Sequence, residues 1–320
     1  MTEDTIIVGA GPIGLACAIS AKRRGIDALV IDAGAVVDSI TRYPIRMTFF
    51  TTPELLEIGG HPVVCAGPKP TREESLMYYR GVARAENLRV KTYTKLVDAT
   101  RTQAGIECVV ETRTGSDTLR CSRLVLATGY FNQPNRLGVA GDDLPHVHYY
   151  FDEAHLSYGL DVVVIGGKNS AVEAALQLFR AGARTSLVYR GATFPPGVKY
   201  WLRPDIQNRI KAGQITAHLS TEVVRIEESC VVVRRQNGEE RSIPADRVYP
   251  LIGFKSDVEL FRRVGIEIHP TTGRPTIDMD TLETNVPGIY MAGSITAGFA
   301  TSEIFIENGR FDGEKIFGHD

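Results

Sequence analysis

The chain has 320 residues, of which 43% are hydrophobic and 23% charged, and its formal net charge is −2. This length exceeds one typical domain, so two domains are expected, and the small charge favours neither nucleic acid nor an anionic membrane as a partner. Apolar runs stay well below the roughly 20 residues that cross a membrane. The acidic start "MTED" leads directly into a glycine motif without a signal peptide, so we expect a cytoplasmic protein. The five cysteines are scattered, which predicts neither a disulfide framework nor a metal site.

Strand and helix patterns alternate along the chain, which predicts an α/β protein with parallel sheets. The first part contains predicted strands at 5–8, 28–32, 89–113 and 123–130, a helix up to about residue 25, and an amphipathic helix at 71–87. Thr71 and Glu74 have the spacing of a capping box at the start of that helix. The rest contains a second strand–helix–strand unit at 161–190, antiparallel strands at 221–235 and 241–252, a helix at 256–264, a strand at 288–294 and a final helix within 302–311.

A glycine motif follows the first predicted strand, in "TIIVGAGPIGLACAIS" (5–20). Gly9 suits the tight turn, Gly11 leaves room for a pyrophosphate, and Gly14 lets the helix and the strand pack closely. The helix N-terminus then directs free N–H groups at the phosphates. Asp32 ends the next strand, where its carboxylate can accept a hydrogen bond from a ribose 2′-OH. The pattern predicts a dinucleotide with a free 2′-OH.

A second, degenerate motif opens the later strand–helix–strand unit, in "VVVIGGKNSAVEAA" (162–175). Lys168 stands at the middle glycine position and Ala171 at the last one, where alanine is tolerated. The next strand ends at Tyr189-Arg190, where the first unit has its acid. A carboxylate there would repel a 2′-phosphate, whereas an arginine can bind it through a planar fork of donors. Arg190 therefore either binds a 2′-phosphate or is a solvated arginine at a strand end.

The first motif favours a nucleotide with a free 2′-OH and the second favours one with a 2′-phosphate, so we expect FAD at the first motif and NADPH at the second. A hydride would then pass from the nicotinamide to the flavin. "LATGY" (126–130) resembles the strand end at which two-dinucleotide flavoproteins pass from one domain to the other. "ETNVPGIYMAGSI" (283–295) resembles their terminal FAD segment, which usually closes Gly-Asp but here closes Gly293-Ser294. These features predict an FAD-binding domain at 1–133 and 254–320 and an inserted NADPH-binding domain at 134–253.

Over nearly its whole length the chain resembles the bacillithiol-disulfide reductase family, a thioredoxin-reductase-like group of NADPH-dependent flavoproteins. The resemblance rests on "YPIRMTFFTTPELLEIGG" (43–60), "VVVIGGKNSAVEAALQL" (162–178), "TTGRPTIDMDTLETN" (271–285) and "EIFIENGRF" (303–311). It implies two Rossmann-like domains of the thioredoxin-reductase type and a homodimer or higher oligomer. It also implies a flavin lined by Thr48, Phe49 and Phe50, although the paired phenylalanines fit an ordinary core equally well, and closed by a helix at 303–310. The residues then expected to hold the cofactors are Gly9, Gly11, Pro12, Ile13, Gly14, Asp32, Thr48, Phe50, Leu96, Thr128, Gly129, Gly293 and Ser294 for FAD, and Gly167, Lys168, Asn169, Ser170 and Arg190 for NADPH.

One position departs from that family. Members proposed to reduce bacillithiol disulfide carry a cysteine within "GPCG" at the first motif, where a helix N-terminus lowers the thiol pKa and favours the thiolate. This chain has Ile13 there, and isoleucine cannot form a mixed disulfide. Cys17 is the nearby thiol, one helical turn deeper, and a buried cysteine is usually an inert small hydrophobe. The resemblance therefore carries the fold to this chain but not the chemistry of a protein thiol.

Three interpretations of the function remain. The first is an NADPH:FAD oxidoreductase that passes electrons from the flavin directly to a low-molecular-weight disulfide, or to a redox protein such as ferredoxin or flavodoxin. The second is a flavin-dependent monooxygenase, which "ATGYFNQP" (127–134) and "GGKNSA" (166–171) faintly echo. The third is a non-enzymatic flavin redox sensor. The sequence favours them in that order.

Overall fold

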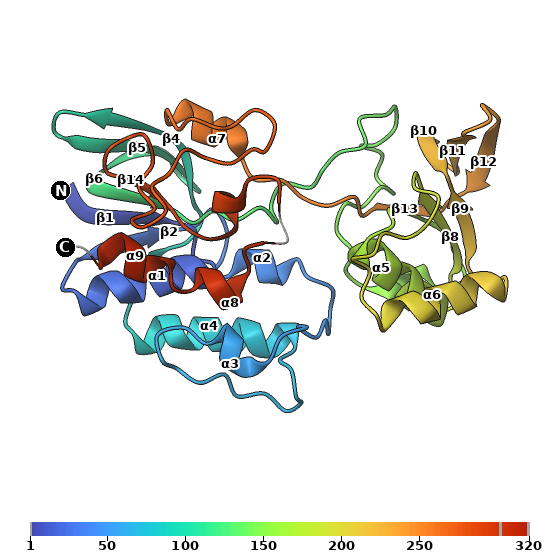
Figure 1. Ribbon diagram of the computed structural model, residues 1–320, viewed down its shortest axis with the longest axis horizontal. Helices are drawn as coiled ribbons and strands as arrows, with labels where there is room; N and C mark the ends of the chain where they lie inside the picture. The colour runs from blue at the N-terminus through green and yellow to red at the C-terminus, as the bar shows by residue number, and fades with distance from the viewer. Residues whose placement is uncertain (1, 301–302, 319–320) are drawn as a thin grey trace. The chain divides into compact units, whose positions relative to one another are not determined.

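The computed structural model describes residues 2–300 and 303–318 of the chain (Figure 1). Its contacts divide the chain into two compact units. The first unit comprises Met1–Thr41, Arg46–Gln133 and Phe254–Asp320, and the second comprises Arg42–Ile45 and Pro134–Gly253. Each unit has a sheet and an apolar core of its own.

The first unit is built on a sheet in the order β3-β2-β1-β6-β5-β4, with β14 paired to β6. Its strands are β1 (Thr2–Val8), β2 (Ala28–Ile31), β3 (Arg89–Lys91), β4 (Thr94–Thr102), β5 (Gly105–Thr112), β6 (Gly115–Leu126) and β14 (Ile289–Met291). β3, β2, β1, β14 and the second half of β6 run parallel, whereas β4, β5 and the first half of β6 form an antiparallel ribbon. The parallel strands end at one edge, so the loops after Val8 and Leu126 meet there, and the Ala127 N–H donates to the Val8 carbonyl at 2.8 Å.

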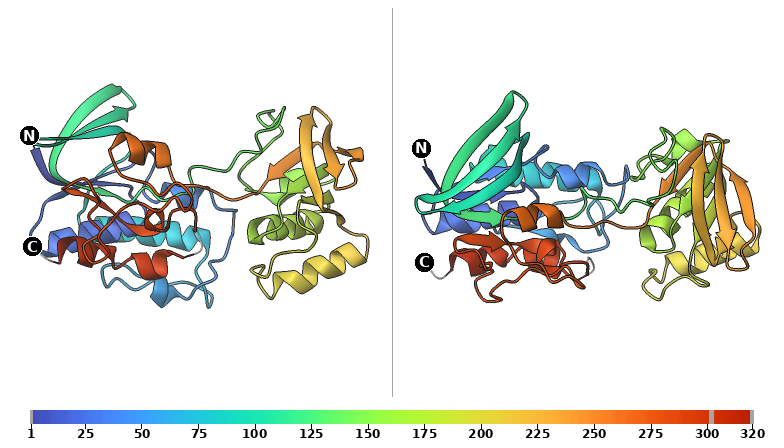
Figure 2. Two further views of the ribbon diagram at one scale, coloured as in Figure 1. Left: turned by 45° about the horizontal axis from the view of Figure 1, so that its top comes forward. Right: turned by 90° about the horizontal axis from the view of Figure 1, so that it is seen from above.

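Two long helices of the first unit match the sequence expectations. α1 (Pro12–Arg23) follows β1, and α4 (Arg72–Ala85) begins at the predicted capping box. The Thr71 hydroxyl accepts from the Glu74 N–H at 3.2 Å, and the Glu74 carboxylate accepts from the Thr71 N–H at 2.8 Å. α9 (Asp312–Phe317) lies alongside α1 below the sheet (Figures 1 and 2). The shorter helices are α2 (Asp38–Thr41), α3 (Pro53–Leu56), α7 (Val258–Arg263), α8 (Ile306–Gly309) and α9 (Asp312–Phe317), together with the 3-10 turn η2 (Gly293–Ala297).

The second unit contains a parallel sheet in the order β13-β7-β8-β9 and an antiparallel sheet in the order β10-β11-β12. The parallel strands are β7 (Asp161–Ile165), β8 (Arg184–Tyr189), β9 (Thr216–Leu219) and β13 (Arg247–Pro250); the antiparallel strands are β10 (Thr221–Glu227), β11 (Cys230–Arg235) and β12 (Glu240–Pro244). The helices are η1 (Ala154–Ser157), α5 (Asn169–Arg180) and α6 (Leu202–Lys211). The strand–helix–strand unit predicted at 161–190 is thus β7-α5-β8.

Two sequence expectations about the second unit are corrected. The segment 221–235 is a hairpin of two strands, because the polar residues at 228–229 form a turn between β10 and β11. The segment 241–252 divides into β12, which pairs with β11, and β13, which runs parallel to β7. The buried Val248 and Tyr249 explain the division, since each packs into an apolar cluster together with residues of β7.

The end of the chain also differs from its expectation. Instead of one helix over 303–310, the structure has α8 at 306–309 and a separate α9, and residue 302, at the start of the segment expected to contain the helix, lies outside the described part. The Asn308 side chain accounts for the late start, because it accepts from the Phe305 N–H at 2.8 Å and donates to the Glu303 carbonyl at 2.9 Å. These bonds hold 303–305 in a non-helical conformation.

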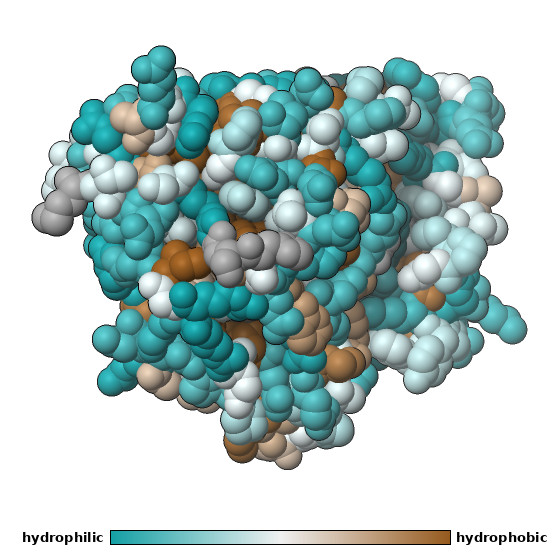
Figure 3. All heavy atoms as spheres, turned by 60° about the vertical axis from the view of Figure 1, so that its left-hand side comes forward, coloured by the Kyte–Doolittle hydropathy of each residue, from teal (hydrophilic) through white to brown (hydrophobic). Residues whose placement is uncertain are grey.

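The described helices include none that is long and apolar enough to cross a bilayer. Figure 3 shows one face of the molecule, on which apolar side chains form separate patches among hydrophilic ones.

Candidate functional site

The first glycine motif forms a tight loop between β1 and α1, at the edge where the parallel strands end. Gly9 has a φ of +114°, and a Cβ there would come within 2.4 Å of the Ala127 carbonyl oxygen. A Cβ on Gly14 would come within 1.8 Å of the Gly9 carbonyl oxygen. Both glycines are therefore required by the close packing of the loop, the helix and the neighbouring strand end.

Gly11 has a different role, because nothing crowds it. A Cβ at this position would have no neighbouring atom within 4 Å, and the backbone is extended, with a φ of −73° and a ψ of 175°. Within the described part of the chain, no side chain caps the first turn of α1. The loop therefore presents open space in front of a helix N-terminus with free N–H groups, which is the arrangement that binds a pyrophosphate.

Asp32 is fixed beside this loop at the end of β2. One carboxylate oxygen accepts from the Ala10 N–H at 2.7 Å, and the other accepts from the Gly34 N–H at 2.7 Å. A carboxylate oxygen can accept more than one hydrogen bond, so this group is of the type that binds a ribose hydroxyl. The same carboxylate therefore orders the glycine loop and offers the acceptor that the sequence predicts.

The loop after β6 adds a hydroxyl at the same place. Thr128 adjoins Gly9, since a Cβ on Gly9 would lie 3.4 Å from the Thr128 Cα. The Thr128 Oγ1 is buried without a hydrogen-bond partner in the described structure. Buried hydroxyls are rarely left unpaired, so this atom is suited to a ligand that completes it. Gly129 follows with a φ of +63°.

Ile13 packs against two segments far away in the sequence. A Cβ on Gly293 would come within 2.6 Å of the Ile13 Cδ1, and a Cβ on Gly309 would come within 2.7 Å of the same atom. Ile13 therefore fills the space between the first turns of α1 and η2 and the end of α8. The structure thus brings together the first glycine motif, Gly293-Ser294 and the end of α8.

The other residues expected near the flavin divide into surface and core. Phe50 is exposed, and its ring meets that of Phe305 edge to face at 6.3 Å, whereas Phe49 is buried. Thr48 is exposed, and its backbone forms an isolated antiparallel β-bridge with that of Thr71. Leu96 is only 4% exposed and belongs to the core of the sheet, so a contact with a cofactor there would have to come from its backbone.

Cys17 is buried inside the first unit. Its side chain is fully enclosed, and α9 approaches so closely that a Cβ on Gly313 would lie 2.8 Å from the Cys17 Cα. Burial raises the pKa of the Cys17 thiol, and the charge of Asp312 raises it further. The thiol therefore stays protonated and cannot act as a nucleophile at neutral pH.

This state of Cys17 leads to a direct prediction. In the folded protein at mildly alkaline pH, an alkylating reagent should modify Cys65 and Cys230, which are partly exposed, and leave Cys17 unmodified. Mass spectrometry of the digested protein would measure this, with the denatured protein as the control in which Cys17 also reacts. Rapid modification of Cys17 in the folded protein would contradict the prediction.

The second glycine motif repeats the geometry of the first in the other unit. Gly166 has a φ of +139°, and a Cβ there would lie 2.6 Å from the Leu251 carbonyl oxygen. Lys168 stands where Gly11 stands in the first motif, with a similar extended backbone of φ −95° and ψ −173°. Lysine fits that conformation without strain, and the exposed side chain adds a positive charge at the start of α5.

Tyr189 replaces the acid of the first unit. Its ring lies against Gly167, where a Cβ would come within 2.6 Å of the ring carbons. Gly167 therefore accommodates the ring at the loop position where Ala10 binds the Asp32 carboxylate in the first unit. Arg190 follows directly and is exposed, and no ion pair engages it among the described residues.

Asn169 has a structural role that the sequence did not reveal. Its side chain accepts from the Lys199 N–H at 2.9 Å and donates to the Gly197 carbonyl at 3.1 Å. The side chain thus orders the loop that follows β8, while Ser170 beside it is exposed. Of the expected NADPH residues, Asn169 is committed to the protein through its side chain, whereas Lys168 and Arg190 remain available to a ligand.

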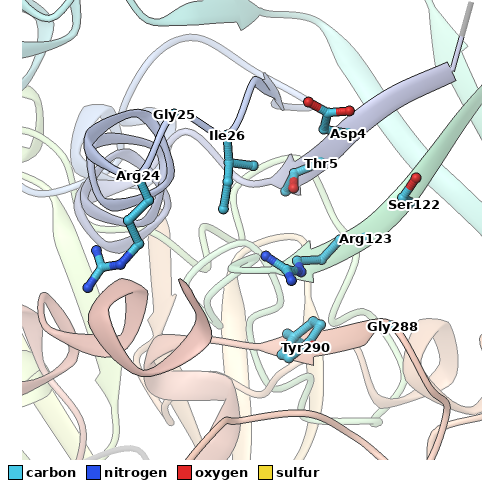
Figure 4. A pocket seen from close by; sticks show the side chains of 9 residues that line it. All are labelled: Asp4, Thr5, Arg24, Gly25, Ile26, Ser122, Arg123, Gly288 and Tyr290. Carbon is cyan, nitrogen blue, oxygen red and sulfur yellow. The ribbon is translucent and has the colours of Figure 1, made fainter. Parts of the chain in front are cut away.

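A separate cavity of about 470 Å³ lies at the opposite edge of the first sheet, near the start of β1. Arg24, Ile26, Arg123 and Tyr290 surround it (Figure 4). Nucleotides in such sheets bind outside the carboxyl ends of the strands. This cavity is therefore distinct from the dinucleotide loops.

Comparisons with known proteins agree with this geometry. The model of the pyridine nucleotide-disulphide oxidoreductase family matches residues 6–293. Bacilliredoxin reductase Bdr of Bacillus subtilis is 43% identical over 314 residues, covering 98% of this chain and 96% of that protein. The solved structure of bacillithiol disulfide reductase Bdr (YpdA) from Bacillus cereus superposes with a TM-score of 0.97 at 38% identity, covering 100% of this chain and 98% of that one. The thioredoxin reductase of T. acidophilum has a TM-score of 0.74 at 21% identity, covering 98% and 96%, which shows a shared fold.

Fold and glycine loops thus define an enzyme, a flavoprotein oxidoreductase of the thioredoxin-reductase type, which confirms the predicted α/β fold class. The chain belongs to the pyridine nucleotide-disulphide oxidoreductase family and, within it, to the bacillithiol-disulfide reductases that the sequence resembles.

Proposed function

We propose that the protein is an NADPH-dependent FAD oxidoreductase that reduces its acceptor directly from the flavin, without a protein thiol. FAD would bind the first unit and NADPH the second. When bound, the flavin accepts a hydride from the nicotinamide and passes the electrons on. The acceptor that we favour is a low-molecular-weight disulfide, because the relatives are named for a disulfide substrate and for bacilliredoxin.

The residues of the first unit fit FAD. Gly11 leaves the space that a pyrophosphate needs, and the first turn of α1 offers its N–H groups. Asp32 is oriented to accept a ribose hydroxyl, and Thr128 offers an unpaired buried hydroxyl. FAD, whose adenosine ribose has a free 2′-OH, is compatible with the negative charge of Asp32.

The residues of the second unit fit NADPH. Tyr189 removes the negative charge that would repel a 2′-phosphate, and Arg190 offers a guanidinium without a competing carboxylate in the described structure. Lys168 adds positive charge where the pyrophosphate would meet the start of α5.

One observation carries the thiol-free proposal. The position of the family's cysteine is filled by Ile13, whose side chain occupies the space beside Gly293 and Gly309. The nearby thiol of Cys17 is buried and has a raised pKa. Electrons must therefore pass from the flavin to the acceptor without a mixed disulfide on the protein. Reduction of a disulfide then consumes two electrons and two protons and yields two thiols.

The proposal is tested by anaerobic reduction of the purified protein. Added NADPH should bleach the flavin absorbance, and a low-molecular-weight disulfide added next should restore it. Ferredoxin and flavodoxin, added in separate reactions, are the alternative acceptors. A flavin that NADPH does not bleach would contradict the proposal.

Ile13→Cys is expected to create a thiol where this chain has none. The new side chain stands in the first turn of α1, where the helix N-terminus favours the thiolate. A long-wavelength charge-transfer absorbance between thiolate and flavin is therefore expected in Ile13→Cys and not in the parent protein. Ile13→Ser is the matched control, since it has a similar size and no thiol. Such a band in the parent would contradict the thiol-free proposal.

The homodimer or higher oligomer implied by the resemblance and the cytoplasmic location expected from the sequence stay predictions.

A further inference from the structure

Asp312 is a carboxylate in the flavin half of the molecule that the sequence does not single out. It opens α9, and its Oδ2 accepts from the Gly293 N–H at 2.7 Å. Gly293 is the first residue of η2 and has a φ of +78°. Gly293 also lies against the Ile13 side chain at the start of α1. The turn that begins η2 is therefore held between the Asp312 carboxylate and the Ile13 side chain.

The Asp312 carboxylate is partly buried, at the start of a helix that packs on α1. α9 packs closely on α1, since a Cβ on Gly313 would approach both Cys17 and Ser20 within 3 Å. Burial raises the pKa of the Asp312 carboxyl, and the Gly293 hydrogen bond and the charge of Lys315 offset only part of this rise. Lys315 itself donates to the Met279 carbonyl at 3.1 Å, and no ion pair involves Asp312 in the described structure.

This arrangement costs stability. A carboxyl whose pKa is raised on folding binds its proton more tightly in the folded state, so its ionisation at neutral pH opposes folding. An uncharged side chain with an oxygen acceptor would avoid that cost. Costly polar groups of this kind gather at functional sites, and this one binds the first residue of η2, which contains Gly293 and Ser294, two residues that the sequence predicts to hold FAD.

We propose that Asp312 is a positioning residue for the flavin: its carboxylate holds the Gly293 amide from behind and so fixes the Gly293-Ser294 turn against Ile13. The inference rests on the proposed binding of FAD to the first unit. A charge-assisted hydrogen bond orients an amide better than a neutral one does. The carboxylate thus fixes η2 in the conformation that receives the cofactor, while its charge also helps to keep Cys17 protonated.

The test measures how fast the full-length, FAD-loaded protein releases its flavin on dilution, followed by the rise in flavin fluorescence. Asp312→Ala removes the acceptor and should release FAD about tenfold faster, as expected for the loss of a hydrogen bond to a charged group. Asp312→Asn keeps an oxygen acceptor at the same place and should stay within about threefold of the parent, since only the charge assistance is lost. Asp312→Glu keeps the charge but displaces the acceptor, so it should also release FAD faster than the parent. It replaces Asp312→Ala in the test if Asp312→Ala does not fold.

Asp257→Ala is the matched control. Asp257 lies in the same unit, and its carboxylate accepts from the Leu260 N–H at 3.1 Å at the start of α7. Its loss should leave FAD release unchanged. If Asp312→Ala and Asp312→Glu release FAD no faster than Asp257→Ala does, the inference about Asp312 is wrong and the proposed function still stands. The same holds if Asp312→Asn releases FAD as fast as Asp312→Ala does. A parent protein that does not bind FAD would overturn the proposed function and this inference with it.

Discussion

Gly11→Val is expected to yield a folded protein that contains almost no flavin. The backbone at Gly11 is extended, and a Cβ there meets no atom within 4 Å, so valine fits the protein without strain. The added side chain instead occupies the space in which the pyrophosphate must approach the first turn of α1. We expect bound FAD to fall at least about tenfold, because backbone approach at this glycine is the basis of the motif. Absorbance of the purified protein measures the flavin, and circular dichroism measures the fold.

Two further substitutions separate this effect from a general effect of losing a glycine. Gly81→Val places the same side chain at another open position, on α4, and should retain the flavin. Gly14→Ala forces a Cβ against the Gly9 carbonyl oxygen and should lower the thermal stability as well as the flavin content. A folded Gly11→Val protein with a full complement of FAD would show that the first motif does not bind the cofactor.

Arg190→Ala is expected to weaken the binding of NADPH while leaving the binding of NADH nearly unchanged. The loss of a charge-assisted contact with a phosphate corresponds to about 1.5–3 kcal/mol, or roughly ten- to a hundredfold in the KM for NADPH. NADH lacks the 2′-phosphate and has no such contact to lose. Steady-state reduction kinetics with both nucleotides measure the two effects.

The control for Arg190 is Lys211→Ala, which removes another exposed cation of the same unit, at the end of α6. It should change neither KM. Equal changes for NADPH and NADH in Arg190→Ala would show that Arg190 supports the structure and does not bind the phosphate.

Local patterns predicted the parts of the site that depend on short spacings. The glycine loops, the acid at Asp32 and the capping box at Thr71 each follow from residues close in sequence, and the structure has these loops and this box where the patterns indicate. The bond between Asp312 and Gly293 and the bonds of Asn169 to the loop at 197–199 could not be predicted in this way. They join segments 19 or more residues apart, and a lone Asp or Asn in a sequence fits many other roles.

The strand at 247–250 was misassigned for a related reason. Its apolar residues suit either an antiparallel or a parallel neighbour, and only the assembled core shows that β7 is the partner. The bounds of the short helix α8 could likewise not be predicted, because the Asn308 side chain determines where this helix begins.

The most direct test of the account is turnover by a protein without cysteine. Cys17, Cys108 and Cys121, which are buried, would be replaced by alanine, and the partly exposed Cys65 and Cys230 by serine. The FAD content and circular dichroism would establish that the variant is folded and loaded. The variant should reduce a low-molecular-weight disulfide with NADPH at a kcat/KM within about threefold of the parent, because no cysteine takes part in the proposed reaction; the thiols formed are the readout. The replacements should cost little stability, because burying a methyl in place of a thiol removes little apolar area. A folded, flavin-loaded variant that NADPH still reduces, but that no longer reduces the disulfide, would contradict the thiol-free mechanism.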